Sequence, residues 1–567
     1  MPSEEQLFRC LKSNRTIKWP AGSGNPLDHL LRWARHEPST VAVAFTLPES
    51  DKFLVRSYGE MLRRVLAAYG SMEKQPAGPI GIVAGQHVST LEAAMVAIAA
   101  KREFVLIDPL SKSYDRELSR LRRWTLAGLV IPALEEMPTT LVDRLSWLTQ
   151  CGGQAGLWSL GFNPLANVDL LGDDTVKPRM SPLRYLDCDW RKPLAHLYPR
   201  QGDCAYSYTP RALSAGACAV SRWLKLEERT RILCGVNIDR VEGLMLALAS
   251  VMSGATCIMP VRIDAENFWR HATESAADLA RVDPELIENL LDRPPRPADV
   301  SLNRLKYMVV DAGRLSAKLT SQFFDSFEIP LIHCFGTPQT GGYALGMPVD
   351  LPRCEYEFAL RDNISGQELD FCNVRIDVEQ GSGARSRDRI SEGLLAVRGL
   401  SVSSGCCDGH DYRPWDSAWL ATTALATSRP AHGRHYYTVH GLTDESVTIK
   451  GYRLWPSQVE RSLLETFAFL DDCVVVARSD AAGVDELCAV LMLPQDCDHF
   501  RRSELLGLMQ ARLAAGAVDG LNEKTIPGQL IPLPDNQIPK DEDGRPDRTA
   551  LQHIINQHER DGRRSAS

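Results

Sequence analysis

The fold is decided by residues 442–456, Leu442-Thr443-Asp444-Glu445-Ser446-Val447-Thr448-Ile449-Lys450-Gly451-Tyr452-Arg453-Leu454-Trp455-Pro456. Val447 and Ile449 alternate with polar neighbours, which is the pattern of a half-buried strand. Gly451 then supplies a residue suited to a tight turn. The stretch therefore predicts a hinge followed by a β-hairpin.

A helix is predicted directly after this hairpin. Ser457 and Glu460 have the spacing of a capping box, in which each side chain bonds the backbone of the other residue. The apolar residues that follow share one helical face, and they are Val459, Leu463 and Phe467. Residues 442–467 are thus expected to enter a small folded domain.

Composition indicates a soluble protein of more than one domain. The chain has 567 residues, more than one hydrophobic core normally supports. Its hydrophobic fraction is 44%, and its net charge of -8 argues against a nucleic-acid surface. No run of about 18 apolar residues occurs, so we expect a cytoplasmic protein with no membrane partner.

The 15 cysteines are scattered, and the only close pair is Cys406-Cys407. None of them has the spacing of zinc ligands, and a chain of this length does not need disulfides. We therefore expect reduced, mostly buried thiols and no metal site. His432, His435 and His440 also lack ligand spacing. Asp408, His410 and Asp411 follow the cysteine pair and are candidate polar groups for a cleft.

Apolar strands alternate with helices over most of the chain. This order predicts an α/β fold with a parallel sheet covered on both faces. The expected strands are 41–45, 79–84, 104–109, 232–236 and 254–259, and the expected helices are 27–34, 58–71, 90–100 and 243–252. Near the C-terminus, strands at 473–477 and 487–493 and a helix at 503–513 predict a smaller α+β domain.

Residues 442–456 resemble the hinge of the adenylate-forming superfamily, which includes acyl-CoA synthetases, peptide-synthetase adenylation domains and luciferases. The superfamily pattern there is approximately G-R-x-D-x-x-V-K-I-x-G-x-R-I-E-P-x-E-I-E. Residues 97–109 and 304–316 resemble two further superfamily segments, and the resemblance extends over about residues 27–551. It implies a large N-terminal domain of layered α/β subdomains (1–441), a hinge (442–445) and a small, mobile α+β C-terminal domain (446–567).

The resemblance also implies where ATP contacts should lie, and the phosphate loop differs from the superfamily. Its pattern Y-T-S-G-T-T-G-x-P-K-G corresponds to residues 205–213, which contain no glycine. Tyr208 occupies a position of a small residue, and Pro210 removes an amide donor. Arg211 could replace the superfamily lysine as a charge. We expect a surface turn here in place of a phosphate loop.

Four other ATP motifs are altered as well. The magnesium motif Y-G-x-T-E keeps Gly336, but Gln339 replaces the glutamate, and an amide is a poor ligand for a hard cation. In the ribose motif W-x-x-T-G-D, Ala424 replaces the aspartate. In the hinge, Asp444 is kept although Leu442 replaces an arginine, and in the closing motif Arg545 stands at the position of the catalytic lysine.

The acyl pocket implied by the resemblance contains several polar candidates, namely Asp239, Glu242, Cys334 and Gly336. Asp239 would bind a substrate ammonium, as an aspartate does in amino-acid-activating members, or would cap a helix. His333 precedes Cys334, but neighbours on a strand point to opposite faces, so the two cannot act as nucleophile and base. We expect Cys334 to be a buried structural thiol.

These replacements affect side chains that handle ATP, whereas the fold-specifying segments are kept. They predict a protein that does not catalyse normal ATP-dependent adenylation and needs no cofactor. It would bind an acyl or aminoacyl group, or a thioester on a carrier protein, as an ATP-independent transferase or a non-catalytic partner in a biosynthetic pathway. The alternative is an active ligase that forms acyl-AMP with ATP and Mg²⁺, with Arg211 and Arg545 as its cations.

Overall fold

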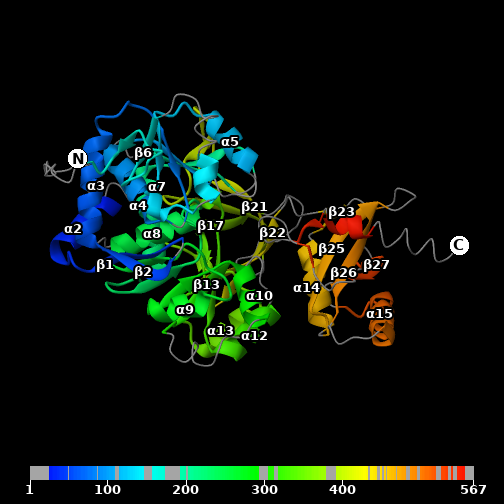
Figure 1. The fold of residues 1–567 in the computed structure, drawn as a ribbon. Coiled ribbons are helices and arrows are strands. Elements are labelled where there is room, and N and C mark those ends of the chain that lie inside the picture. The colour runs from blue at the N-terminus through cyan, green and yellow to red at the C-terminus, as the bar shows by residue number, and fades with distance from the viewer. Residues whose placement is uncertain are drawn as a thin grey trace. The chain divides into compact units, whose positions relative to one another are not determined.

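The computed structural model describes residues 25–555 except 49, 86, 109–113, 139, 146–155, 173–191, 200–201, 293–303, 312–316, 378–390, 432–433, 443–446, 450–451, 455, 468, 480–484, 494–498, 519–520, 522–524, 534–537, 540–545 and 549 (Figure 1). The chain divides into two compact units. The first comprises residues 1–375, 396–422 and 429–437, and the second comprises 376–395, 423–428 and 438–567. The predicted hinge at 442–445 stays a prediction, because residues 443–446 are outside the described part.

The first unit contains a nine-stranded sheet, here called sheet A. Its order is β16 (Gln367–Glu368), β15 (Leu345–Gly346), β14 (Leu331–Phe335), β13 (Tyr307–Asp311), β12 (Leu279–Arg281), β10 (Arg231–Cys234), β11 (Thr256–Met259), β1 (Val41–Leu47) and β2 (Ser50–Ser57). Strands β14, β13, β12, β10, β11 and β1 are parallel. Their carboxyl ends therefore meet along one edge of the sheet.

A second nine-stranded sheet of this unit is called sheet B. Its order is β20 (Asp411–Pro414), β19 (Gly405–Asp408), β9 (Ala205–Tyr208), β8 (Ala195–Leu197), β4 (Phe104–Ile107), β3 (Ile80–Val83), β5 (Gly128–Ile131), β6 (Gly156–Ser159) and β7 (Val168–Asp169). The strands from β8 to β7 are parallel, whereas β9, β19 and β20 are antiparallel.

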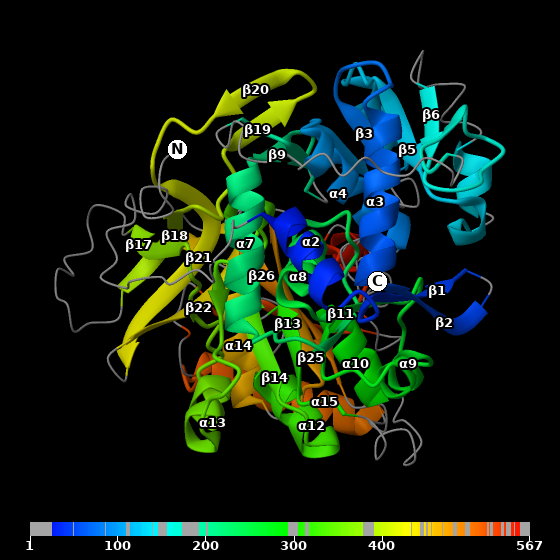
Figure 2. The ribbon, with the colours of Figure 1, turned by 90° about the vertical axis from the view of Figure 1, so that its left-hand side faces the viewer.

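Five helices form a layer between the two sheets (Figure 2). They are α2 (Pro26–His36), α3 (Tyr58–Met72), α4 (Val88–Ala100), α7 (Pro210–Trp223) and α8 (Val241–Ser253). One hydrophobic core joins these helices to both sheets. Helices α4 and α8 are buried on nearly every side, which explains why both are apolar along almost their whole length.

The outer faces of the sheets have their own cores. Helices α9 (Phe268–Glu274), α10 (Pro284–Asp292) and α12 (Ala317–Phe327) cover sheet A, and α12 contacts α13 (Arg353–Arg361). Helix α5 (Tyr114–Arg122) and the segment after the short helix η1 (Leu134–Glu136) cover sheet B. The layered α/β architecture predicted from the sequence is confirmed.

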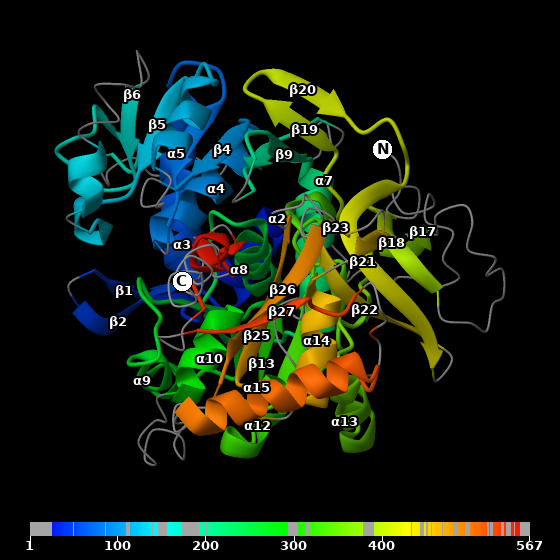
Figure 3. The same cartoon turned by 90° about the vertical axis from the view of Figure 1, so that its right-hand side faces the viewer.

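The second unit is built on a three-stranded sheet of β25 (Asp472–Ser479), β26 (Asp485–Met492) and β27 (Gln529–Pro532). Helices α14 (Pro456–Thr466) and α15 (His499–Ala514) pack on one face of it (Figure 3). Leu551 and Ile555 pack on the other face. The predicted hairpin is present as β23 (Val447–Ile449) and β24 (Tyr452–Leu454). A smaller C-terminal α+β domain is therefore confirmed.

A four-stranded sheet contributes residues to both units. Its order is β17 (Cys372–Asp377), β18 (Ser391–Gly399), β21 (Leu420–Ala431) and β22 (Arg434–Leu442). Among the described residues, no helix is long and apolar enough to cross a membrane.

The capping box predicted for Ser457 and Glu460 is wrong. Helix α14 begins at Pro456, so Ser457 lies inside its first turn and donates its hydroxyl to the His440 carbonyl at 2.6 Å. The Glu460 carboxylate instead accepts hydrogen bonds from the Val475 backbone at 2.8 Å and from Arg548 at 3.0 Å. A proline at the first helical position needs no amide partner there, which explains the start of the helix.

Candidate functional site

Polar side chains gather at the carboxyl edge of sheet A. Strand β12 ends at Arg281, β13 at Asp311 and β14 at Phe335, directly after Cys334, and Glu242 lies in the first turn of α8, which follows β10. In parallel α/β sheets, ligands bind outside the carboxyl ends of the strands. This edge is therefore the candidate site for a substrate.

Arg281 is the most deeply buried cation of this edge, with 4% of its surface exposed. Its Nη1 donates to the Val282 carbonyl, and Tyr343 is a hydrogen-bonding neighbour. Nε has no hydrogen-bond partner in the described structure. Burial acts to lower the pKa of Arg281, but nearby Cys334, Tyr343 and Asp283 act to raise it, and the net shift is upward. The guanidinium thus stays charged.

Glu242 is the carboxylate of α8 that faces the same cluster. Burial raises its pKa to about 7, and Arg281 acts in the opposite direction. The main-chain carbonyl of Glu242 accepts the Tyr343 hydroxyl at 3.3 Å. A carboxyl group with this pKa is only partly ionised near neutral pH.

Cys334 and His333 lie on β14 and point to opposite faces, as expected. The Cys334 thiol contacts the Val310 carbonyl at 3.4 Å, and burial raises its pKa to about 12. The His333 ring lies 3.3 Å from both the Thr320 hydroxyl and the Ile364 carbonyl, and burial lowers its pKa to about 4. The predicted burial of Cys334 is confirmed, whereas its purely structural role stays a prediction.

Asp239 does not cap α8. The N-cap residue of that helix is Arg240, and the Arg240 side chain makes no cap hydrogen bond. The helix-cap interpretation of Asp239 is therefore wrong, whereas its binding of a substrate ammonium stays a prediction.

The stretch that corresponds to the phosphate loop is not the surface turn we expected. Strand β9 ends at the fully buried Tyr208, and α7 begins only two residues later at Pro210. The single residue between them, Thr209, caps α7 by accepting the Ala212 amide at 3.1 Å. Because Thr209 and Pro210 are also buried, a direct strand-to-helix junction replaces the loop. Arg211 is half-buried in the first helical turn.

This junction contacts the turn that corresponds to the magnesium motif. The Tyr208 hydroxyl donates to the Pro338 carbonyl. The Gln339 side chain hydrogen-bonds the Tyr206 phenol, and the Gln339 carbonyl accepts from the Ser403 amide at 3.1 Å and hydroxyl at 2.9 Å. The two stretches are thus joined by protein contacts.

Gly336 has a steric role in the same turn. A Cβ atom at this position would lie 1.9 Å from the Gly342 carbonyl oxygen, closer than any side chain can be placed. The glycine therefore allows two backbone segments to approach each other.

Two guanidinium groups flank the position of the ribose motif. Arg375 and Arg398 lie over the Trp419 ring, 4.3 and 4.7 Å from its centroid. Ala424 is fully buried in β21, and its methyl group offers no oxygen to a ribose hydroxyl. Asp444 and Arg545 lie outside the described residues.

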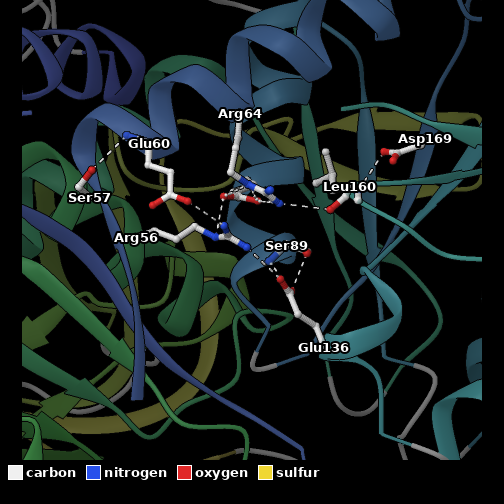
Figure 4. Close-up of polar contacts among 10 residues, drawn as sticks. Arg56, Ser57, Glu60, Arg64, Ser89, Glu136, Leu160 and Asp169 are labelled. Atoms are coloured by element: carbon white, nitrogen blue, oxygen red, sulfur yellow. Dashed lines mark hydrogen bonds and ion pairs between the residues drawn. The ribbon is translucent and has the colours of Figure 1, made fainter. Parts of the chain in front are cut away.

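A buried charge network that we did not predict lies between α3, α4, β2 and η1 (Figure 4). Arg56 Nε lies 3.3 Å from Glu92 Oε1, and Arg56 Nη2 lies 3.3 Å from Glu136 Oε1. Arg64 Nε lies 2.9 Å from the same Glu92 oxygen. The Glu136 carboxylate also accepts the Ser89 hydroxyl at 2.6 Å. Glu92 was the available signal, because a lone charge in an apolar helix requires buried partners.

Within the described part of the chain, no group of three or more His, Cys, Asp or Glu side chains could hold a metal ion. The described cysteines are all free thiols, and most are buried.

The sequence matches no family model. It is similar to the sulfoacetate–CoA ligase of Cupriavidus necator, with 25% identity over 298 residues, or 50% of this chain and 53% of that protein. It is also similar to tyrocidine synthase 3 of Brevibacillus parabrevis, with 24% identity over 278 residues, or 47% of this chain and 4% of that protein. The matches thus span about half of one relative and a small part of the other.

The fold is similar to that of a solved CoA ligase. The anthranilate CoA ligase AuaEII, solved in complex with anthranoyl-AMP, superposes with a TM-score of 0.72 at 14% identity, covering 95% of this chain and 99% of that one. The resemblance of the sequence is thereby confirmed, and the chain has the fold of the adenylate-forming superfamily.

Proposed function

We propose that this protein binds an acyl or aminoacyl group at the carboxyl edge of sheet A and does not form adenylates from ATP in the superfamily's usual way. It acts as an ATP-independent acyl transferase or as a non-catalytic partner in a biosynthetic pathway. The observation that carries this proposal is Tyr208, whose buried phenol bonds the Pro338 carbonyl where a phosphate loop would be needed.

The residues at the superfamily's nucleotide positions do not fit MgATP. The junction of β9 and α7 has one residue, so it offers no cradle of backbone amides. Gln339 is a neutral amide that is already bonded to Tyr206. The Ala424 side chain cannot accept a hydrogen bond from ribose. The proposed function therefore includes no ATP-dependent step.

The acid-binding part of the proposal is supported by the polar edge of sheet A. Arg281 ends β12, and Glu242 and Tyr343 interact with one another and with Arg281. The relative from Cupriavidus necator is named for sulfoacetate, an acid with a second anionic group, and the solved structure is named for anthranilate. Both are small acids, which suits a site of this kind.

A second candidate is an acid-activating ligase with a remodelled nucleotide site. It is favoured by the relatives, which are named as ligases and a synthase. In this candidate, Arg211 and Arg545 supply the cations that a lysine and loop amides supply in the superfamily.

The test is calorimetric titration of the full chain with MgATP and, separately, with an acyl-sulfamoyl-adenosine analogue. A superfamily ligase under the same conditions is the positive control. We expect no heat from MgATP. Binding of MgATP together with acid-dependent pyrophosphate exchange would refute the proposal in favour of the ligase, and loss of that exchange in Arg545→Ala would assign Arg545 its role.

The carrier-protein part has its own test. The full chain is passed over immobilised holo and apo forms of carrier proteins encoded near its gene. Holo-specific binding supports a thioester substrate, and equal absence of binding to both forms removes the carrier protein from the proposal.

A further inference from the structure

Arg281 is a buried cation whose charge is not neutralised by an ion pair. Its side chain is almost fully enclosed, yet within the described ranges no carboxylate oxygen lies within ion-pair distance of its guanidinium. Burying an unpaired charge costs several kcal/mol unless a partner is supplied. The edge of sheet A therefore contains a buried guanidinium whose Nε donor is available to an anion.

The groups nearest to Arg281 form no ion pair with it at bonding distance among the described residues. Asp283 and Asp311 nevertheless act electrostatically on the guanidinium, and both raise its pKa. Cys334 and Tyr343 are neutral hydrogen-bonding groups, because burial raises the pKa of both. Asp283 forms an ion pair with Arg240, in which Arg240 Nη1 lies 3.3 Å from Asp283 Oδ2. Glu242 is only partly ionised at neutral pH, since burial raises its pKa to about 7.

The position of Arg281 suits a ligand more than a structural role. It is the last residue of β12, between the ends of β10 and β13, so it lies at the edge where ligands of parallel sheets bind. A guanidinium has a planar set of donors that matches the oxygens of carboxylates and sulfonates. Nε is the donor that remains without a partner among the described residues.

We propose that Arg281 binds a second oxyanion of the acid, so that the site selects carboxylic acids that carry another carboxylate or a sulfonate. This rests on the proposed binding of an acyl group at the same edge. Arg281 is then the residue that determines specificity, while the carboxyl group that forms the acyl bond lies away from it.

The test compares each dicarboxylate with its own monomethyl ester. Malonate, succinate and glutarate, their monomethyl esters, and 3-sulfopropionate are titrated into the full wild-type chain at constant ionic strength. We expect at least one diacid to bind 10-fold or more tightly than its ester, and the sulfonate arm shows which oxyanion is preferred. Equal binding of every diacid and its ester would overturn the inference but leave acyl binding intact.

If no acid in any arm binds, the inference and the acyl-binding proposal both fail. These outcomes need no variant, so they do not depend on how a substitution folds.

Variants then assign the preference to Arg281. Arg281→Met keeps the length of the side chain and should reduce the diacid-to-ester ratio to near one, whereas Arg281→Lys should keep part of it. The matched control is Arg231→Met, because Arg231 is a partly buried arginine at the start of β10, the opposite end of a neighbouring strand. A ratio unchanged in a folded Arg281→Met protein would refute the role of Arg281.

Discussion

The Arg64 guanidinium holds the Glu92 carboxylate through two parallel hydrogen bonds, Nε to Oε1 at 2.9 Å and Nη2 to Oε2 at 3.0 Å. Arg64 also donates to the Leu160 carbonyl at 3.2 Å. The pair joins α3 to α4, and Arg56 of β2 reaches the same carboxylate. Strand β2 of sheet A and helices α3 and α4 are thus connected through one buried anion.

Replacing Glu92 with glutamine should destabilise the protein strongly. The substitution leaves Arg56 and Arg64 with too few anions in a buried position, and breaking such a pair costs about 3 kcal/mol or more. The measurement is urea unfolding followed by circular dichroism. Glu357→Gln is the matched control, because Glu357 pairs with Arg353 on an exposed helix surface and its loss should leave the midpoint unchanged. Similar midpoints for both variants would contradict the network's importance.

Tyr208→Phe should destabilise the chain by about 1–2 kcal/mol. The hydroxyl is fully buried, and its removal leaves the Pro338 carbonyl without this donor. Tyr412→Phe is a suitable control, since the Tyr412 hydroxyl bonds the Ser404 carbonyl at 3.0 Å in a less buried setting. Thermal unfolding of the wild type and both variants should give the lowest midpoint for Tyr208→Phe. A Tyr208→Phe protein as stable as wild type would mean that this contact does not hold the junction.

Gly336→Ala should lower stability by several kcal/mol or prevent folding. The added Cβ would meet the Gly342 backbone at 1.9 Å, and backbone atoms cannot yield as a flexible side chain can. Gly70→Ala is the opposite case, because nothing lies within 4 Å of its Cβ position in α3 and alanine is the better helix former. We expect Gly70→Ala to raise the unfolding midpoint slightly. Soluble yield and thermal unfolding distinguish the two, and a fully stable Gly336→Ala protein would contradict the steric role.

The strands and helices of the first unit could be predicted because their apolar runs are long and unambiguous. Helix α4 is an example, since Val88–Ala100 contains one charged side chain. Strand β2 was not predicted, because Ser50–Ser57 is largely polar and becomes a strand only by pairing with the edge of β1. The local pattern of apolar residues thus identifies buried helices and strands. It misses a strand such as β2, which forms only by pairing with another strand.

The candidate site could be predicted only in part. Glu242 and Cys334 were identified through motif positions, but Arg281 was not, because an arginine at the end of a three-residue strand looks like an exposed charge. Its burial follows from the order of β10, β12 and β13 in sheet A, which no local spacing contains. The capping box failed for the same reason, since Glu460 is used by β25 and Arg548 instead of by its own helix.

The ionisation of Glu242 should make stability depend on pH. Burial raises its pKa from 4.5 to about 7, so the folded protein binds a proton that the unfolded chain has released between these values. The stabilising contribution is therefore fully present below pH 4.5 and is lost as the pH rises through 7, by about 3 kcal/mol in total. Glu242→Gln removes the pH-dependent contribution of this carboxyl group. The wild type should therefore lose stability relative to the variant between pH 5 and pH 8. Urea unfolding of both proteins across this range tests it, with Glu357→Gln as the exposed control. Parallel profiles for wild type and Glu242→Gln would show that the Glu242 carboxyl group ionises normally.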